Sequence, residues 1–258
     1  MSRGVIRIFP DHETLSKVLA ETIVQRSHSS IVTRKVFDIA LSGGGTPKNL
    51  YRLLASSPYI DRIHWEKVRF FWGDERLVPP DHPESNYGQV YEQLLQHVNV
   101  TSDQIFRIRG ELGLEEAVAD YSSQLAEASP DRNTWPRFDV VLLGLGEDGH
   151  VASIFPGPAS EQELQAPVIA TKLEYQDRPV ERVTLTPMVF NTAREIFYLV
   201  VGEGKAGALA RVFSDEEDLN KQPAVRIRPE SGRITWFIDE AAGSLLSKDL
   251  KREWNYDH

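Results

Sequence analysis

One loop of the sequence gathers three side chains that can carry protons or charge. Glu147, Asp148 and His150 lie in the stretch GLGEDGH, directly after the apolar run 138–143. That run is short and rich in branched side chains, which is typical of a buried parallel strand. Glycines between the polar residues let the backbone turn sharply and approach a ligand closely. Because open α/β sheets bind ligands at the carboxyl ends of their strands, the loop predicts a site for acid–base chemistry.

A second polar loop follows another apolar run, 36–41. The stretch SGGGTPKNLYRLL passes from Ser42 through three consecutive glycines to Thr46 and Pro47. We expect Thr46 to be the N-cap of a helix and Pro47 its first residue. The backbone N–H groups of such a loop can converge on an anion, which predicts a phosphate site. The spacing is not that of a P-loop, so no nucleotide is implied, and a tight turn without a ligand remains the alternative.

A third polar loop, GDERLVPPDHPESNYG, follows the expected strand 68–72. The strand brings Asp74, Glu75 and Arg76 to its end, and prolines then hold the chain until Ser85 can cap the next helix. A surface cluster of ion pairs is the alternative interpretation. The position after a buried strand, which all three loops share, favours one common site.

Composition restricts the class of protein. The 258 residues are 41% hydrophobic and 26% charged, as in ordinary globular proteins, and the net charge of −9 argues against nucleic-acid binding. No apolar stretch is long enough for a signal peptide or for a membrane span of about 20 residues, so we expect a cytoplasmic protein that does not enter a membrane. Without cysteines there are no disulfides or thiolate nucleophiles. The other histidines lack ligand spacing, so we predict no metal.

The elements that must position the three loops alternate between strands and helices. This alternation predicts a doubly wound α/β fold, with a mostly parallel sheet covered by helices on both faces, as one domain over 1–258. We expect Asp11 to cap the first helix, whose apolar residues include Leu15 and Leu19. Strands are expected at 5–9, 36–41, 68–72, 138–143, 166–171, 182–185, 195–201 and 233–238, and further helices at 86–98, 112–128, 187–193, 205–213 and 240–247.

Taken together, the motifs resemble the 6-phosphogluconolactonase family, which shares a broad fold group with glucosamine-6-phosphate deaminase and ribose-5-phosphate isomerase. The resemblance covers nearly the whole chain, through LSGGGTP, WGDERLVPPDHPESNYG, FDVVLLGLGEDGHVASIFPG, RVTLTP from Arg182 and GEGKAGAL from Gly202. It implies a doubly wound α/β domain that hydrolyses 6-phosphoglucono-1,5-lactone to 6-phosphogluconate. The expected partner is therefore this small sugar-phosphate lactone. We expect no cofactor and no obligatory protein partner.

The resemblance also implies roles for individual residues. Ester hydrolysis needs a base for the attacking water, a donor for the oxyanion and an acid for the departing ring oxygen. His150 can supply both proton steps, because an imidazole with an unperturbed pKa of about 6.5 is largely neutral yet readily protonated. Asp148 would orient the imidazole or stabilise its charged form, and Arg76 would offset developing negative charge. A purely structural role for His150 is the alternative. Only the motif around this residue argues against it.

Phosphate binding is the remaining role that the resemblance implies. A phosphate dianion suits two cations, and Arg182 and Lys205 are the expected charge partners. Arg182 could instead extend from a strand edge, and Lys205 could be an exposed residue at a helix start. The loop that would surround the phosphate consists of Ser42, Gly43, Gly44, Gly45 and Thr46.

Two other functions remain open. A glucosamine-6-phosphate deaminase would continue after the histidine as A-F-N-E-P, with the glutamate acting in ring opening and proton transfer. This sequence reads A-S-I-F-P, and Phe155 stands where that carboxylate should be. A sugar-phosphate-binding protein without catalysis is the second alternative, although no basic face or helix-turn-helix supports a regulator of transcription.

Overall fold

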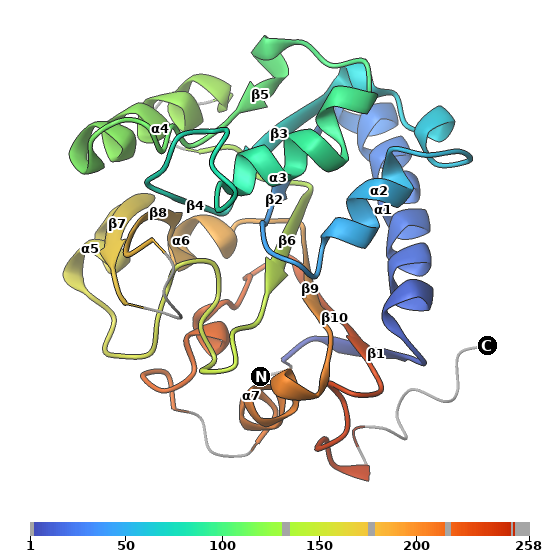
Figure 1. Ribbon diagram of the computed structural model, residues 1–258, viewed down its shortest axis with the longest axis vertical. Coiled ribbons are helices and arrows are strands. Elements are labelled where there is room, and N and C mark those ends of the chain that lie inside the picture. Colours follow the sequence, from blue (N-terminus) through green and yellow to red (C-terminus); the bar gives the residue numbers. More distant parts are fainter. Residues whose placement is uncertain (1–2, 131–134, 175–178, 215–217, 249, 251–258) are drawn as a thin grey trace.

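A seven-stranded sheet, all of whose neighbouring strands are parallel, forms the centre of the computed structural model (Figure 1). The structure describes residues 3–130, 135–174, 179–214, 218–248 and 250. Helices lie on both sides of the sheet, which confirms the doubly wound α/β fold. In spatial order the strands are β1 (Val5–Phe9), β10 (Arg233–Asp239), β9 (Glu195–Val200), β6 (Val140–Gly144), β2 (Phe37–Leu41), β3 (Val68–Trp72) and β5 (Ile105–Phe106).

Helix α1 (His12–Arg34) shows how the sequence specifies these elements. The Asp11 side chain accepts a hydrogen bond from the Thr14 N–H at 2.7 Å, which confirms the predicted N-cap. Leu15, Leu19 and Ile23 are buried at helical spacing. The other helices are α2 (Lys48–Leu54), α3 (Asn86–Gln93), α4 (Leu114–Ala128), α5 (Glu161–Gln165), α6 (Pro187–Phe190) and α7 (Ala206–Val212). Short 3₁₀ helices cover Ile60–Arg62, Trp65–Lys67, Leu95–His97, Ser102–Gln104, Glu203–Lys205 and Pro223–Arg226.

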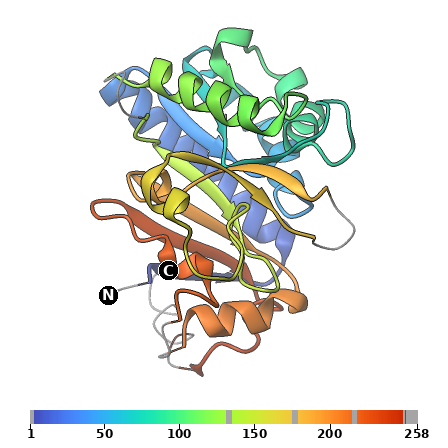
Figure 2. The same cartoon turned by 90° about the vertical axis from the view of Figure 1, so that its left-hand side faces the viewer.

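A second, antiparallel sheet was not predicted. It contains β4 (Asp74–Arg76), β8 (Glu181–Leu185) and β7 (Val168–Lys172), in that order. This small sheet lies to the left of the large sheet in Figure 1 and in front of it in Figure 2, so it covers one side. Gly73 joins the two sheets, because its N–H donates to Leu41 at 2.9 Å and its carbonyl accepts from Leu185 at 2.8 Å.

Several predicted helices are wrong in their first or last turns: the helix expected at 187–193 ends at Phe190, and the one expected at 112–128 begins at Leu114. Thr46 does not cap α2: Pro47 is the N-cap residue, and it makes no side-chain capping bond. The reason is a turn in which the Lys48 N–H donates to the Gly45 carbonyl at 3.4 Å, so the helix begins one residue later than expected. The helix predicted at 86–98 ends at Gln93 and is followed by a separate 3₁₀ turn.

The helix predicted at 240–247 is also wrong, because residues 240–245 form turns. The Asp239 carboxylate accepts hydrogen bonds from the N–H groups of Ala242 at 2.8 Å and Gly202 at 3.0 Å. A side chain that bonds nearby backbone in this way offers the chain an alternative to helix. The aspartate thereby ties the carboxyl ends of β9 and β10 together.

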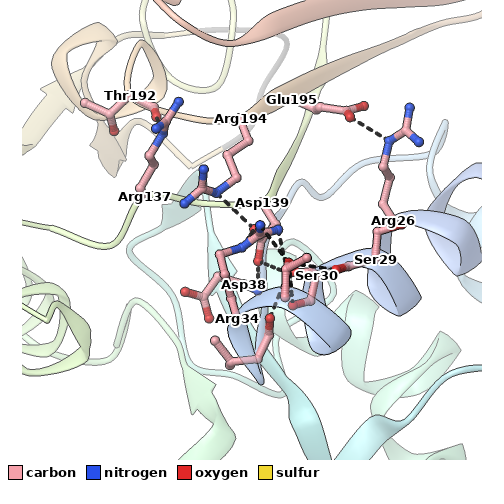
Figure 3. A network of polar contacts seen from close by, with 12 residues as sticks. Arg26, Ser29, Ser30, Arg34, Asp38, Arg137, Asp139, Thr192, Arg194 and Glu195 are labelled. Atoms are coloured by element: carbon pink, nitrogen blue, oxygen red, sulfur yellow. Dashed lines mark hydrogen bonds and ion pairs between the residues drawn. The ribbon is translucent and has the colours of Figure 1, made fainter.

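The amino ends of the central strands are held by a polar network (Figure 3). One oxygen of Asp139 accepts from the Ser30 hydroxyl at 2.6 Å and from the Asp38 N–H at 2.9 Å, and the other pairs with Arg34 at 2.7 Å. Burial raises the pKa of Asp38, against the opposing effect of Arg69, whose Nε lies 2.6 Å from the carboxylate. The network fixes the strands at the end of the sheet opposite to the predicted site.

Candidate active site

A cavity of about 280 Å³ lies where the three polar loops meet at the carboxyl ends of the strands. It is lined by every site residue that the sequence predicted except Asp148. The lining residues are Ser42, Gly43, Gly44, Gly45, Thr46, Pro47, Asp74, Arg76, Asn86, Leu143, Gly144, Leu145, Gly146, Glu147, His150, Ala152, Arg182, Leu199 and Lys205.

The side chains of His150 and Asp148 form a hydrogen-bonded pair at this cavity. The distance from His150 Nδ1 to Asp148 Oδ1 is 2.6 Å, and the His150 backbone N–H donates to the same oxygen at 3.0 Å. Burial pushes the pKa of Asp148 upward, but the hydrogen bond and charge of His150 outweigh it, so this pKa lies below its ordinary value. Asp148 therefore remains a carboxylate near neutral pH. Its contact with the imidazole keeps Nδ1 of the ring directed at the carboxylate.

The glycines of this loop make the pair possible. A Cβ on residue 146 would lie 2.1 Å from His150 Nδ1 and 2.5 Å from Asp148 Oδ1, so only glycine fits. Gly149 has a φ of +98°, a conformation that strongly favours glycine. The Gly146 N–H also donates to the His150 carbonyl at 2.8 Å, which closes the loop. The geometry thus supports sharp turning at these glycines, and close approach of the backbone to a ligand stays a prediction.

The glycine-rich loop after β2 is anchored at its start and end. The Tyr51 hydroxyl donates to the Ser42 carbonyl at 2.6 Å, and His12 Nε2 lies 2.8 Å from the Thr46 carbonyl oxygen. The Gly44 N–H donates to Gln89 Oε1 at 3.0 Å, so this group is already engaged. By contrast, the N–H groups of Gly43, Gly45 and Thr46 make no hydrogen bond to residues within the described ranges. They are the donors of the loop that an anion can use.

Arg76 and Arg182 face the cavity from neighbouring strands. They are directly opposite each other in the antiparallel pair β4–β8, and their exposed fractions are 5% and 3%. Arg76 Nη1 donates to the Glu84 carbonyl at 2.5 Å, and Arg182 Nε donates to the Pro179 carbonyl at 3.2 Å. Like charges opposite each other are unfavourable, and more so when buried. The Arg76–Glu84 ion pair at 3.3 Å offsets part of this repulsion, and a bound anion would offset more of it.

Glu75 holds the start of α3 beside these arginines. Its carboxylate accepts from the N–H groups of Arg76 at 2.7 Å, Asn86 at 2.7 Å and Tyr87 at 2.8 Å, and from the Ser85 hydroxyl at 3.0 Å. Burial raises the pKa of Glu75 to about 7, although the hydrogen bonds act in the opposite direction. The residues of β4 are buried, so the alternative of a surface ion-pair cluster is wrong.

This pKa leads to a prediction about stability. An unfolded glutamate releases its proton near pH 4.3, whereas folded Glu75 keeps its proton up to about pH 7. Since the folded state binds more protons in this range, the free energy of unfolding falls as pH rises from about 4 to 7, by roughly 3 kcal/mol from this group. Urea unfolding at several pH values should show the decline in the wild type and a clearly smaller one in Glu75→Gln. Equal slopes for both proteins would contradict the assignment.

Sequence reasoning brought Asp74 to the common site without assigning it a role, and it missed Asn86 as a cavity residue. Asp74 Oδ2 accepts from the Ser153 hydroxyl at 2.6 Å, and its other oxygen accepts from Asn86 Nδ2 at 3.2 Å. A Cβ on Gly43 would lie 1.9 Å from Asn86 Oδ1, so the amide packs directly on the glycine loop. Asp74 therefore ties together all three loops. The sequence signal for it was only the general one, a carboxylate after a buried strand.

Lys205 reaches the cavity from the end of β9. Gly202, with a φ of +93°, turns the chain, and its carbonyl accepts from the Lys205 N–H at 3.0 Å. The predicted helix start at Lys205 is early by one residue, because Lys205 ends a 3₁₀ turn and α7 begins at Ala206.

No group of three or more His, Asp or Glu side chains that could hold a metal ion occurs in the described part of the chain. His258 lies outside the described residues. No helix among the described residues is both long and apolar enough to span a membrane.

The chain is similar to known proteins over most of its length. A family model described as glucosamine-6-phosphate isomerases/6-phosphogluconolactonase matches residues 10–236, a range that contains the whole lining of the cavity. The 6-phosphogluconolactonase of Homo sapiens is 36% identical over 251 residues, covering 96% of this chain and 96% of that protein. That of Haemophilus influenzae is 38% identical over 208 residues, covering 81% of this chain and 87% of its own length. The solved structure of the Trypanosoma brucei 6-phosphogluconolactonase has a TM-score of 0.81 and 30% identity, over 95% of this chain and 99% of that one.

Proposed function

The chain belongs to the glucosamine-6-phosphate isomerase/6-phosphogluconolactonase family, and we propose that it hydrolyses 6-phosphoglucono-1,5-lactone to 6-phosphogluconate. This reaction belongs to the oxidative pentose phosphate pathway. The observation that carries the proposal is the cavity itself, where His150, hydrogen-bonded to Asp148, faces the glycine-rich loop and two buried arginines.

In the proposed mechanism His150 moves the protons. With Nδ1 directed at Asp148, the ring uses Nε2 to accept a proton from water as the water oxygen bonds to C1 of the lactone. The tetrahedral intermediate then collapses, the bond from C1 to the ring oxygen breaks, and the imidazolium returns the proton to that oxygen. The ionised Asp148 stabilises the imidazolium between these two steps.

Arg76 stabilises the negative charge that develops on the carbonyl oxygen. Its Nη1 is held by Glu84, whereas its buried Nε has no hydrogen-bond partner among the residues that are described. A guanidinium fixed in this way meets the requirement for a donor that is already in place before charge develops.

The phosphate occupies the other side of the cavity in this proposal. The N–H groups of Gly45 and Thr46 bind phosphate oxygens, together with Ser42, Gly43 and Gly44 of the same loop. Lys205 and Arg182 balance the two negative charges. Gln89 would have to release the Gly44 N–H before that group could take part.

The deaminase alternative is less well supported. Its mechanism needs a carboxylate after the histidine motif, and Phe155 occupies that position. The Phe155 ring contacts His150 with ring centroids 5.0 Å apart, so an apolar group fills the space. The single-domain organisation over 1–258 and the cytoplasmic location remain predictions.

The test of the proposed function is proton release in a pH-stat. Freshly made 6-phosphogluconolactone, mixed with the protein, should release acid faster than the lactone alone at the same pH. Ammonia release from glucosamine 6-phosphate measures the deaminase alternative in parallel. Binding of 6-phosphogluconate without any added rate would instead support the non-catalytic alternative.

A further prediction concerns the shape of the Arg76 side chain. Arg76→Lys keeps the positive charge but loses the planar fork of donors, so kcat should fall clearly, by about tenfold or more. Steady-state assay of the purified variant measures this. Full activity of the lysine variant would show that only the positive charge of Arg76 matters, and not the shape of its guanidinium group.

A further inference from the structure

Phe155 contacts two residues of the proposed site at once. Its ring centroid lies 5.0 Å from that of His150, with the planes tilted by 46°. The guanidinium carbon of Arg182 lies 5.4 Å from the same centroid, over the ring. Phe155 is not among the described residues that line the cavity. The ring therefore lies behind the imidazole and the guanidinium, where it can hold both without contacting substrate.

The backbone before Phe155 is fixed to the small sheet. The backbones of Val151 and Ile154 are hydrogen-bonded to each other across a tight turn, in which Ala152 has a φ of +48°. The Ser153 hydroxyl donates to Asp74 Oδ2 at 2.6 Å, and Ser153 is fully buried. Asp74 begins β4, two residues before Arg76, so the turn is attached to the strand that carries this arginine.

The backbone after Phe155 is fixed as well. The Gly157 N–H donates to the Asn220 carbonyl at 2.7 Å, and its own carbonyl accepts from Arg226. Arg226 in turn pairs with the buried Glu163 at 2.8 Å. Because the chain is anchored on both sides, the ring cannot easily follow a side chain that moves. Such a supporting residue sets the positions of the groups that rest on it.

We propose that Phe155 is a positioning residue, which holds the imidazole of His150 and the guanidinium of Arg182 in one fixed arrangement. This inference rests on the proposed lactonase function. A cation over an aromatic face is attracted to the ring, and an imidazole beside it is limited to fewer orientations. Two kinetic effects follow from one side chain. Losing the ring lowers kcat through His150 and raises KM through Arg182.

The experiment is a pair of double-mutant cycles, which measure whether two residues act together. Phe155→Leu keeps an apolar side chain but removes the ring, and we expect kcat to fall and KM to rise, each by roughly two- to thirtyfold. In His150→Ala the added leucine should leave kcat unchanged and still raise KM. In Arg182→Ala it should leave KM unchanged and still lower kcat. Phe155→Tyr keeps the aromatic face and should retain both constants within about threefold.

Phe106 provides the matched control. It is half-buried on β5, stacks on Phe71 with centroids 4.7 Å apart, and has the Arg69 guanidinium carbon 5.9 Å from its ring centroid. Phe106→Leu therefore removes similar contacts away from the cavity, and it should lower thermal stability while leaving kcat and KM unchanged.

The outcomes separate this inference from the function on which it rests. If the wild type adds no rate to lactone hydrolysis, the proposed function fails and this inference fails with it. If the wild type is active but the effects of Phe155→Leu are the same in all three backgrounds, only the positioning role is refuted. A similar loss of activity in Phe106→Leu would also refute it, because the effect would then be one of general stability.

Discussion

His150→Ala should lower kcat by roughly 10²–10⁴, which is the usual contribution of general acid–base catalysis. KM should stay within a few fold, because the groups that bind the phosphate lie on other loops of the cavity. The measurement is steady-state hydrolysis of 6-phosphogluconolactone by the pH-stat. Since this lactone also opens in water, the enzyme-free rate at the same pH must be subtracted from every value.

Two further observations check the role of His150. Asp148→Asn should reduce kcat less than His150→Ala, because it perturbs the base without removing it. The wild-type kcat/KM should also fall in acid, since a protonated imidazole cannot accept a proton from water. If a folded His150→Ala, judged by circular dichroism, keeps wild-type kcat, another group activates the water. Asp148 would then be the first candidate, because its carboxylate lies 2.6 Å from the ring.

Removal of either cation that is proposed to bind the phosphate should mainly weaken substrate binding. Lys205→Ala and Arg182→Ala should each raise KM by about ten- to over a hundredfold, since one charged contact contributes roughly 1.5–3 kcal/mol. The phosphate keeps its charge throughout the reaction, so its contacts bind ground state and transition state alike, and kcat should change little. For Arg182, the contact with Phe155 adds a smaller effect.

The substrate itself supplies the control for these two variants. Glucono-1,5-lactone without the phosphate should be hydrolysed equally poorly by the wild type and by Lys205→Ala. The exposed Lys221, which pairs with Asp218 at 3.1 Å, offers a matched lysine outside the cavity, and Lys221→Ala should leave KM unchanged. Wild-type KM values in both cavity variants would rule out binding of the phosphate by Lys205 and Arg182.

Apolar runs predicted six of the seven strands of the large sheet, because its central strands are buried on both faces, but they missed the two-residue strand β5. All five residues of β2 are buried, and such a run can hardly be anything but a central strand. The polar loops at the ends of these strands follow from the same pattern, since parallel strands bring their carboxyl ends to one edge. This is why His150, Arg76 and the glycine loop could be placed together from the sequence.

The small sheet could not be predicted in this way. Strand β4 consists of Asp74, Glu75 and Arg76, which have no apolar alternation, and it exists because β8 pairs with it. The register that sets Arg76 opposite Arg182 depends on two segments about a hundred residues apart, and no local pattern encodes it. For the same reason the sequence could not show that Gln89 occupies the Gly44 N–H.

The place of β1 in the large sheet has a consequence for synthesis of the chain. Among the described residues this first strand lies at the edge of the sheet, and it pairs there with β10 alone, the last strand in chain order. A ribosome adding about 5–20 residues per second needs roughly ten to forty-five seconds to proceed from β1 to β10. Throughout that time the edge of β1 that pairs with β10 has no partner strand. The sheet can therefore be completed only after β10 has been made, and until then the backbone groups of β1 that pair with β10 lack their partner strand.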